Sequence, residues 1–152
     1  MKSIMFNVGT CLIALILVGP VRAENLQHVQ QLLETNSCQG CDLSGADLQN
    51  THLIGADLRD ANLTDANLEE ANLEGADLSR ANLENANLNQ TYLNSAELVD
   101  ANLKGANLTD SNFSFANLTE ADLTQATILN TEFVGADLTG VLLPQNVLVQ
   151  QF

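Results

Sequence analysis

A five-residue repeat governs most of this chain. A large apolar residue returns at every fifth position from Leu43 to Leu143, over 21 consecutive repeats. We call this central position i, and it is Leu except at Phe113, Ile128 and Phe133. Position i−2 is usually Ala, position i−1 is usually Asn or Asp, and positions i+1 and i+2 are mostly polar or Gly.

Neither an α-helix nor a flat strand buries this pattern on one side. Five helical residues turn through about 500°, so the apolar residues would spread around the whole helix. On a strand, the odd spacing would send successive apolar residues to opposite faces. A chain that bends after every five residues directs positions i and i−2 inward, and its stacked turns pair about 4.8 Å apart. The period therefore predicts an all-β solenoid over residues 41–145.

The other repeat positions suit such a coil. Ala is small enough to lie inward beside Leu, Asn and Asp accept hydrogen bonds from nearby backbone N–H groups, and Gly adopts the positive φ of tight corners. Burying one Leu contributes about 2 kcal/mol, whereas ordering the backbone costs about 1–2 kcal/mol for each residue. The central column alone therefore cannot stabilise the fold, and we expect contacts between neighbouring coils to contribute.

The repeats resemble those of a known family. Runs such as Ala61-Asn62-Leu63-Thr64-Asp65 and the corresponding segment 101–105 are similar to the pentapeptide repeat family, and the similarity covers residues 41–145. This resemblance implies a right-handed quadrilateral β-helix with four repeats, or 20 residues, in each coil.

Residue pairs at a separation of 20 are compatible with four sides. Phe113 and Phe133 would stack, and Arg80 would lie next to Asp60. A three-sided coil stays open at this stage, because Arg80 would then neighbour Asp65.

The N-terminus predicts export. Residues 1–23 combine Lys2, an apolar stretch that is densest over 11–18, and small residues before an expected cleavage after Ala23. The apolar stretch is shorter than the roughly 20 residues of a membrane span, so no span remains after cleavage. We expect a periplasm or a thylakoid lumen as the destination, with an uncleaved membrane anchor as the alternative.

Both ends of an open solenoid need covering. Within residues 24–40, apolar residues recur at helical spacing, which predicts a short helical cap over the first coil. At the other end, residues 146–152 are expected to cover the last coil or to form a homodimer through the C-terminal end. The oligomeric state, monomer or homodimer, is thus left open.

Composition excludes several functional classes. The chain has 19 acidic and 5 basic residues, for a net charge of −14. Direct binding of nucleic acid needs a basic surface, which this chain lacks. It also contains no Ser-His-Asp arrangement and no Gly-rich phosphate loop. We expect a non-enzymatic protein without a cofactor or a metal ion.

Two cysteines stand where the expected cap meets the first repeat. Cys38 and Cys41 are the only cysteines after the signal segment, and exported proteins commonly oxidise such pairs. The preferred interpretation is a disulfide that joins the cap to the first coil. Free thiols and a redox-active pair are the alternatives, the latter without the βαβ context of thioredoxin-like motifs.

One predicted column is acidic. Four repeats in each coil place Asp57, Asp77, Glu97 and Asp137 above one another at position i−1. This acidic ladder is a candidate site for cations such as calcium, or a face for a basic partner. The alternative is that each carboxylate serves its own turn and is solvated.

A second predicted side is apolar on the outside. Ile54, Tyr92, Phe115 and Val134 all fall on the side that carries Leu53 inward, and few charges accompany them. An apolar area on an otherwise acidic rod is a candidate face for a protein partner, although scattered apolar surface residues are common.

These features favour an exported, non-enzymatic scaffold or protein-binding module, similar to secreted pentapeptide repeat proteins of cyanobacteria and thylakoid lumens. The alternative is an acidic mimic of DNA that inhibits a nucleic-acid-binding protein such as gyrase, as the family resemblance allows. The location of the mature protein separates the two, because gyrase is cytoplasmic.

Overall fold

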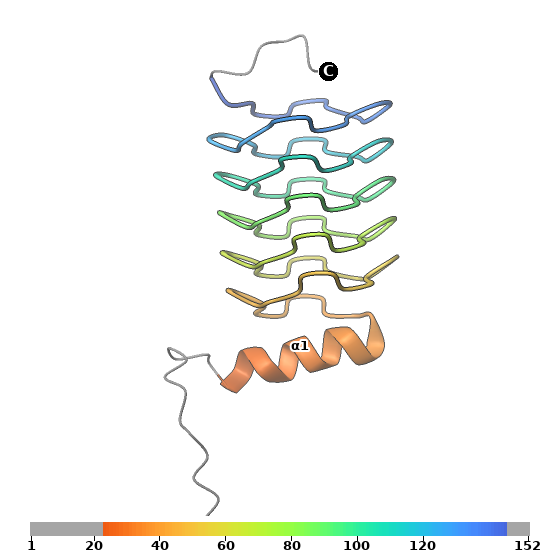
Figure 1. Ribbon diagram of the computed structural model, residues 1–152, viewed down its shortest axis with the longest axis vertical. Helices are drawn as coiled ribbons and strands as arrows, with labels where there is room; N and C mark the ends of the chain where they lie inside the picture. Colours follow the sequence, from red (N-terminus) through yellow and green to blue (C-terminus); the bar gives the residue numbers. More distant parts are fainter. Residues whose placement is uncertain (1–22, 146–152) are drawn as a thin grey trace, which may run out of the picture.

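The computed structural model describes residues 23–145, and it shows one helix at the end of a stack of coils (Figure 1). Helix α1 spans Ala23–Thr35. It stops at Asn36, which has a φ of 57° and whose N–H donates to the Leu32 carbonyl at 2.8 Å. Asn is one of the few residues that tolerate this left-handed end of a helix. The expected cap helix is confirmed, while most of the predicted signal segment and the tail 146–152 lie outside the described residues.

The coils have four sides. Parallel bridges join position i−1 of one coil to position i−1 of the next, always 20 residues apart, from Ser37↔Asp57 to Asp122↔Leu142. Twenty residues contain four repeats, so the three-sided alternative is wrong. The first bridge also shows that the series of backbone bridges already includes Ser37, which precedes the repeats recognised in the sequence.

We name the four sides by their central residues. Side A contains Leu43 and every twentieth residue after it, side B starts in the same way from Leu48, side C from Leu53 and side D from Leu58. Helix α1 lies across the open end of the first coil (Figure 1). The right-handed sense of the coil stays an expectation from the resemblance.

Backbone hydrogen bonds connect each coil to its neighbours. In the repeat around Leu63, the Leu63 N–H donates to the Asn82 carbonyl at 2.7 Å, and the Asp65 N–H donates to the Glu84 carbonyl at 2.9 Å. The corner closes on itself through the Ala66 N–H, which donates to the Leu63 carbonyl at 3.0 Å. The same pattern recurs along the described coils, so their backbone polar groups are satisfied without long strands.

Side chains at position i−1 reinforce the turns. The Asp77 carboxylate accepts hydrogen bonds from the Ser79 backbone N–H at 3.0 Å and from its hydroxyl at 2.6 Å. Between coils, Nδ2 of Asn102 donates to Oδ1 of Asn82 at 2.9 Å. Asn and Asp are therefore frequent here because one oxygen can bridge the corner, as expected from the sequence.

The interior is apolar and closely stacked. Inward Leu and Ala side chains are buried throughout the middle coils, and the rings of Phe113 and Phe133 stack with centroids 5.4 Å apart. Buried hydroxyls occur on side C at position i−2, where Thr91 Oγ1 donates to the Leu68 carbonyl at 2.8 Å. Such bonds remove the cost of placing a hydroxyl in an apolar core.

Burial weakens at the last coil. Ile128 and Leu138 are only partly buried, and Leu143 is 39% exposed. Among the described residues, no further coil stacks above them, so their apolar side chains lack contacts on one side. The inward side chains are therefore uniformly buried in the middle of the rod but only partly buried at its C-terminal end.

We expect Leu93→Ala to lower the free energy of unfolding by about 2–5 kcal/mol, because Leu93 is completely buried and the surrounding coils cannot close the cavity. Thermal and denaturant unfolding measure the change. Asn94→Ala alters the next, outward residue and is expected to change stability by less than about 0.5 kcal/mol. Equal effects of the two substitutions would contradict the inward assignment of Leu93.

Candidate functional site

The four apolar residues predicted for a partner face all lie on side C, but they do not form one patch. Phe115 and Val134 are each 68% exposed and are adjacent, since the Phe115 N–H donates to the Val134 carbonyl at 2.9 Å. Tyr92 is exposed one coil below Asn112, to which it is bridged. Ile54 lies four coils from Val134, or about 19 Å along the axis at the strand spacing.

Phe115 occupies an unusual corner. The i+2 residues at the corners have positive φ, and they are Gly or polar residues except for Phe115, which has a φ of 61°. A bulky side chain in this left-handed region is uncommon. The ring lies over Gly135, because a Cβ added there would come within 2.7 Å of a Phe115 ring carbon. Gly135 therefore leaves the space in which the ring rests. We call Phe115 and Val134 the aromatic corner.

The predicted acidic residues lie on side D. Bridges place Asp57, Asp77, Glu97 and Asp137 in one column, interrupted by Asn117. Nδ2 of Asn117 donates to Oε2 of Glu97 at 2.8 Å. The Thr139 hydroxyl and backbone N–H donate to Asp137 and lower the pKa of that carboxyl. These two carboxylates are thus engaged with neighbouring side chains and turns.

Two arginines partly neutralise the N-terminal half of side D, and the sequence predicted only the contact of Arg80 with Asp60. Arg59 contacts Asp57 at 2.7 Å and Asp77 at 3.6 Å, and Arg80 contacts Asp60 at 2.7 Å. Hydrogen bonds from the guanidinium groups lower the pKa values of Asp57 and Asp60. The sequence signal was present for Arg59, which follows Asp57 by two residues on the same side.

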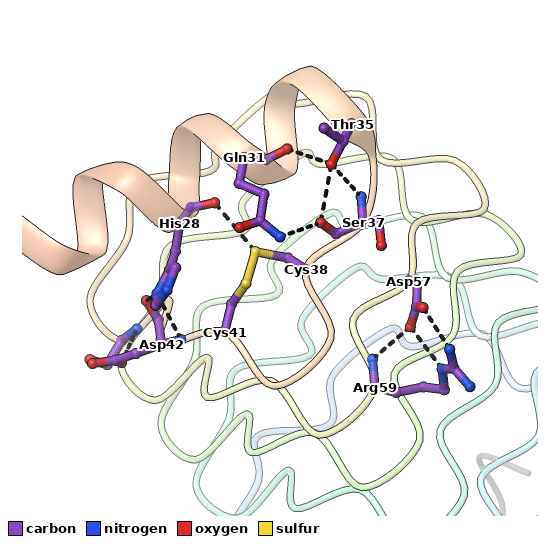
Figure 2. The surroundings of a disulfide bond; sticks show 10 residues. His28, Gln31, Thr35, Ser37, Cys38, Cys41, Asp42, Asp57 and Arg59 are labelled. Carbon is purple, nitrogen blue, oxygen red and sulfur yellow. Dashed lines mark hydrogen bonds and ion pairs between the residues drawn. A yellow bond between two sulfur atoms is a disulfide. The ribbon is translucent and has the colours of Figure 1, made fainter.

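The cysteine pair lies beneath helix α1 (Figure 2). In the structure Cys38 and Cys41 form a disulfide with an S–S distance of 2.04 Å, and both residues are buried. They fill position i of side D and position i−2 of side A, where other repeats carry Leu and Ala. The His28 carbonyl oxygen lies 3.3 Å from Cys38 Sγ, and the Asp42 N–H donates to His28 Nδ1 at 3.1 Å. This burial favours a structural role for the bond.

Other candidate chemistry is sparse in residues 23–145. Within that range no group of three His, Cys, Asp or Glu side chains is arranged to hold a metal ion, and no helix is long and apolar enough to cross a bilayer. An open hollow near the C-terminal end is lined by Lys104, Thr124, Gln125, Leu143, Pro144 and Gln145. It brings no acid–base pair or nucleophile together.

The Arg80–Asp60 pair gives a pH prediction. Because the pKa of Asp60 is lowered in the folded protein, the unfolded chain binds more protons near pH 4, and stability falls as the pH drops through the folded-state pKa. We expect Arg80→Gln to lose less stability than the wild type between pH 7 and about pH 3. The difference is small because both side chains are exposed.

Thermal unfolding midpoints at several pH values measure this effect. Lys104→Gln is the matched control, since it removes one positive charge that makes no ion pair within the part of the chain that the structure describes. Identical pH profiles for the two variants would rule out a specific contribution from the Arg80–Asp60 pair.

Comparisons with known proteins agree with this architecture. The family model described as Pentapeptide repeats (8 copies) matches residues 41–80, 76–114 and 106–143. A solved pentapeptide repeat protein from Nostoc PCC 7120 is 34% identical, with 78% of this chain and 93% of that chain covered and a TM-score of 0.58. The comparison with curated proteins gave no match.

Two further solved structures are similar in sequence. A pentapeptide repeat protein from the cyanobacterium Cyanothece 51142 is 28% identical, covering 78% of this chain and 98% of that chain, with a TM-score of 0.43. A pentapeptide repeat protein from the Arabidopsis thaliana thylakoid lumen is 33% identical, covering 73% of this chain and 68% of that chain, with a TM-score of 0.33. The family model matches most of the length of this chain, and the chain forms 20-residue coils of Ala-Asn/Asp-Leu repeats. This chain therefore belongs to the pentapeptide repeat family.

Proposed function

We propose that this protein is an exported, non-enzymatic scaffold that binds a protein partner through the outer surface of side C near its C-terminal coils. The observation that carries the proposal is the exposure of Tyr92, Phe115 and Val134 on a side whose charged outer residues are Glu74 and Glu132. Large exposed aromatic residues on an otherwise polar surface are typical of protein interfaces.

The construction of the coil supports a binding role over a catalytic one. Catalysis needs reactive groups, such as a nucleophile, a general base or a polarising group, to be brought together in a concave site. Along the described coils, many Asn and Asp side chains at position i−1 instead accept hydrogen bonds from their own turns, as Asn62 Oδ1 does from the Thr64 backbone N–H at 3.2 Å. A rigid outer surface with fixed spacing is suited to presenting residues to a partner.

Export is supported by the sequence of residues 1–23 and by the paired cysteines. A disulfide persists in a periplasm or lumen and is reduced in most cytosols. The acidic mimic of DNA is the competing function, and the carboxylates of side D favour it. That function requires side D to be the contact surface and requires a partner in the cytoplasm.

Site-specific crosslinking tests the proposal. A photo-crosslinking residue at Ser114, on side C between Tyr92 and Val134, is expected to capture a protein from the exported compartment. The same group at Thr124, on the opposite side A, is expected to capture none. Capture only from side D positions such as Thr119, or only in the cytosol, would favour the competing function and contradict this one.

The disulfide gives a second prediction. After denaturation, protein taken from the exported compartment is expected to show no alkylation of Cys38 or Cys41 until it is reduced, and protein retained in the cytosol is expected to show alkylation of both residues by mass spectrometry. Reduction is expected to lower the free energy of unfolding by about 2 kcal/mol. Complete alkylation of the exported protein without reductant would show that the thiols are free.

A further inference from the structure

We propose that the partner is a basic polypeptide segment that packs a large apolar side chain against the aromatic corner and directs Lys or Arg side chains to Glu97 and Asp137. This inference deepens the proposed function and rests on it. It identifies the partner by chemistry, from the exposed apolar residues and from the charges that surround them.

The aromatic corner is a rigid anchor. The Phe115 backbone is fixed by its N–H bond to Val134, and its ring lies over Gly135, which lacks the Cβ that would push it away. A side chain that is already ordered loses little conformational freedom when a partner covers it. Aromatic residues held in this way commonly dominate the energy of an interface.

Charge around the corner determines which partner fits. Glu97 and Asp137 are each one coil from Asn117, which follows Phe115 by two residues. In the described part of the chain neither carboxylate forms an ion pair, whereas the arginines of side D are engaged with Asp57, Asp77 and Asp60 nearer the N-terminus. A basic segment would gain these two contacts, while an acidic one would be repelled by the net charge of −14.

The spacing restricts the segment further. Glu97 and Asp137 lie two coils apart, or about 10 Å along the axis at the strand spacing. Basic residues three positions apart in an extended segment span about 10 Å, as do residues seven positions apart in a helix. An apolar residue between them would lie level with Asn117, beside the aromatic corner.

Three short synthetic peptides serve as probes, with binding measured by fluorescence anisotropy at physiological salt. The first peptide contains Leu between Lys residues that have the spacings given above. The second peptide replaces each Leu by Ser, and the third replaces each Lys by Glu. We expect the first peptide to bind the folded full-length protein and the other two to bind at least about tenfold more weakly, because each lacks one of the two required contacts.

Variants locate the binding site. Phe115→Ser and the double substitution Glu97→Gln with Asp137→Asn are each expected to weaken binding of the first peptide about tenfold. The control, Asp65→Asn with Glu70→Gln, removes the same charge from corners on sides A and B and is expected to change affinity less than about twofold. Equal weakening by the control would show general attraction to an acidic rod and would overturn the inference.

Two glycines in one column provide a sharper comparison. An Ala at 135 would displace the Phe115 ring, whereas an Ala at 75 meets nothing within 4 Å, and both positions have positive φ. Gly135→Ala and Gly75→Ala therefore impose similar backbone strain, and thermal unfolding checks that both variants fold. We expect only Gly135→Ala to weaken the peptide, and unchanged binding would contradict the role of the ring.

The outcomes separate this inference from the proposed function. Capture of a partner through Ser114 without binding of the Leu–Lys peptide would leave the proposed function standing and overturn the partner chemistry. Peptide binding that survives Phe115→Ser would also overturn it. Failure of crosslinking at Ser114 in the exported compartment would count against the proposed function itself.

Discussion

The backbone hydrogen bonds between coils are the interaction on which the rest of the structure depends. They join residues 19 or 21 positions apart and so place residues 20 positions apart side by side, and they form because each repeat ends in a corner with positive φ. Isolated coils would leave these groups unpaired and their apolar interior exposed, so stability arises from stacking rather than from any single repeat. Helix α1 supplies the cover that the first coil cannot obtain from another coil.

The backbone hydrogen bonds between coils also determine how surface residues are arranged. Because positions 20 residues apart stack about 4.8 Å from one another, each outward position of the repeat becomes a column, and one substitution changes the column locally without altering the fold. Side D shows the consequence, since Arg59 and Arg80 partly neutralise its N-terminal half. Side C shows another, since Phe115 and Gly135 together set an aromatic ring in a fixed place.

The candidate site was only partly predictable. Membership of side C followed from the period for Ile54, Tyr92, Phe115 and Val134, because the period assigns each residue to a side. Their separation did not follow, since Ile54 and Val134 occupy the same side four coils apart. The support of Phe115 by Gly135 was also missed, because a sequence pattern does not show the direction of a side chain at a left-handed corner.

The sequence by itself determined the inward columns, the acidic character and the position of the cap helix, because each follows from residue type and from a period repeated without a gap. Only the tertiary structure decided that a coil has four sides rather than three, that Arg59 meets Asp57 and Asp77, and where burial fails at Leu143. These features depend on how far the chain rotates at each repeat before it completes one coil and stacks on the preceding one. A five-residue period does not determine that rotation, whereas the backbone bridges between residues 20 positions apart do.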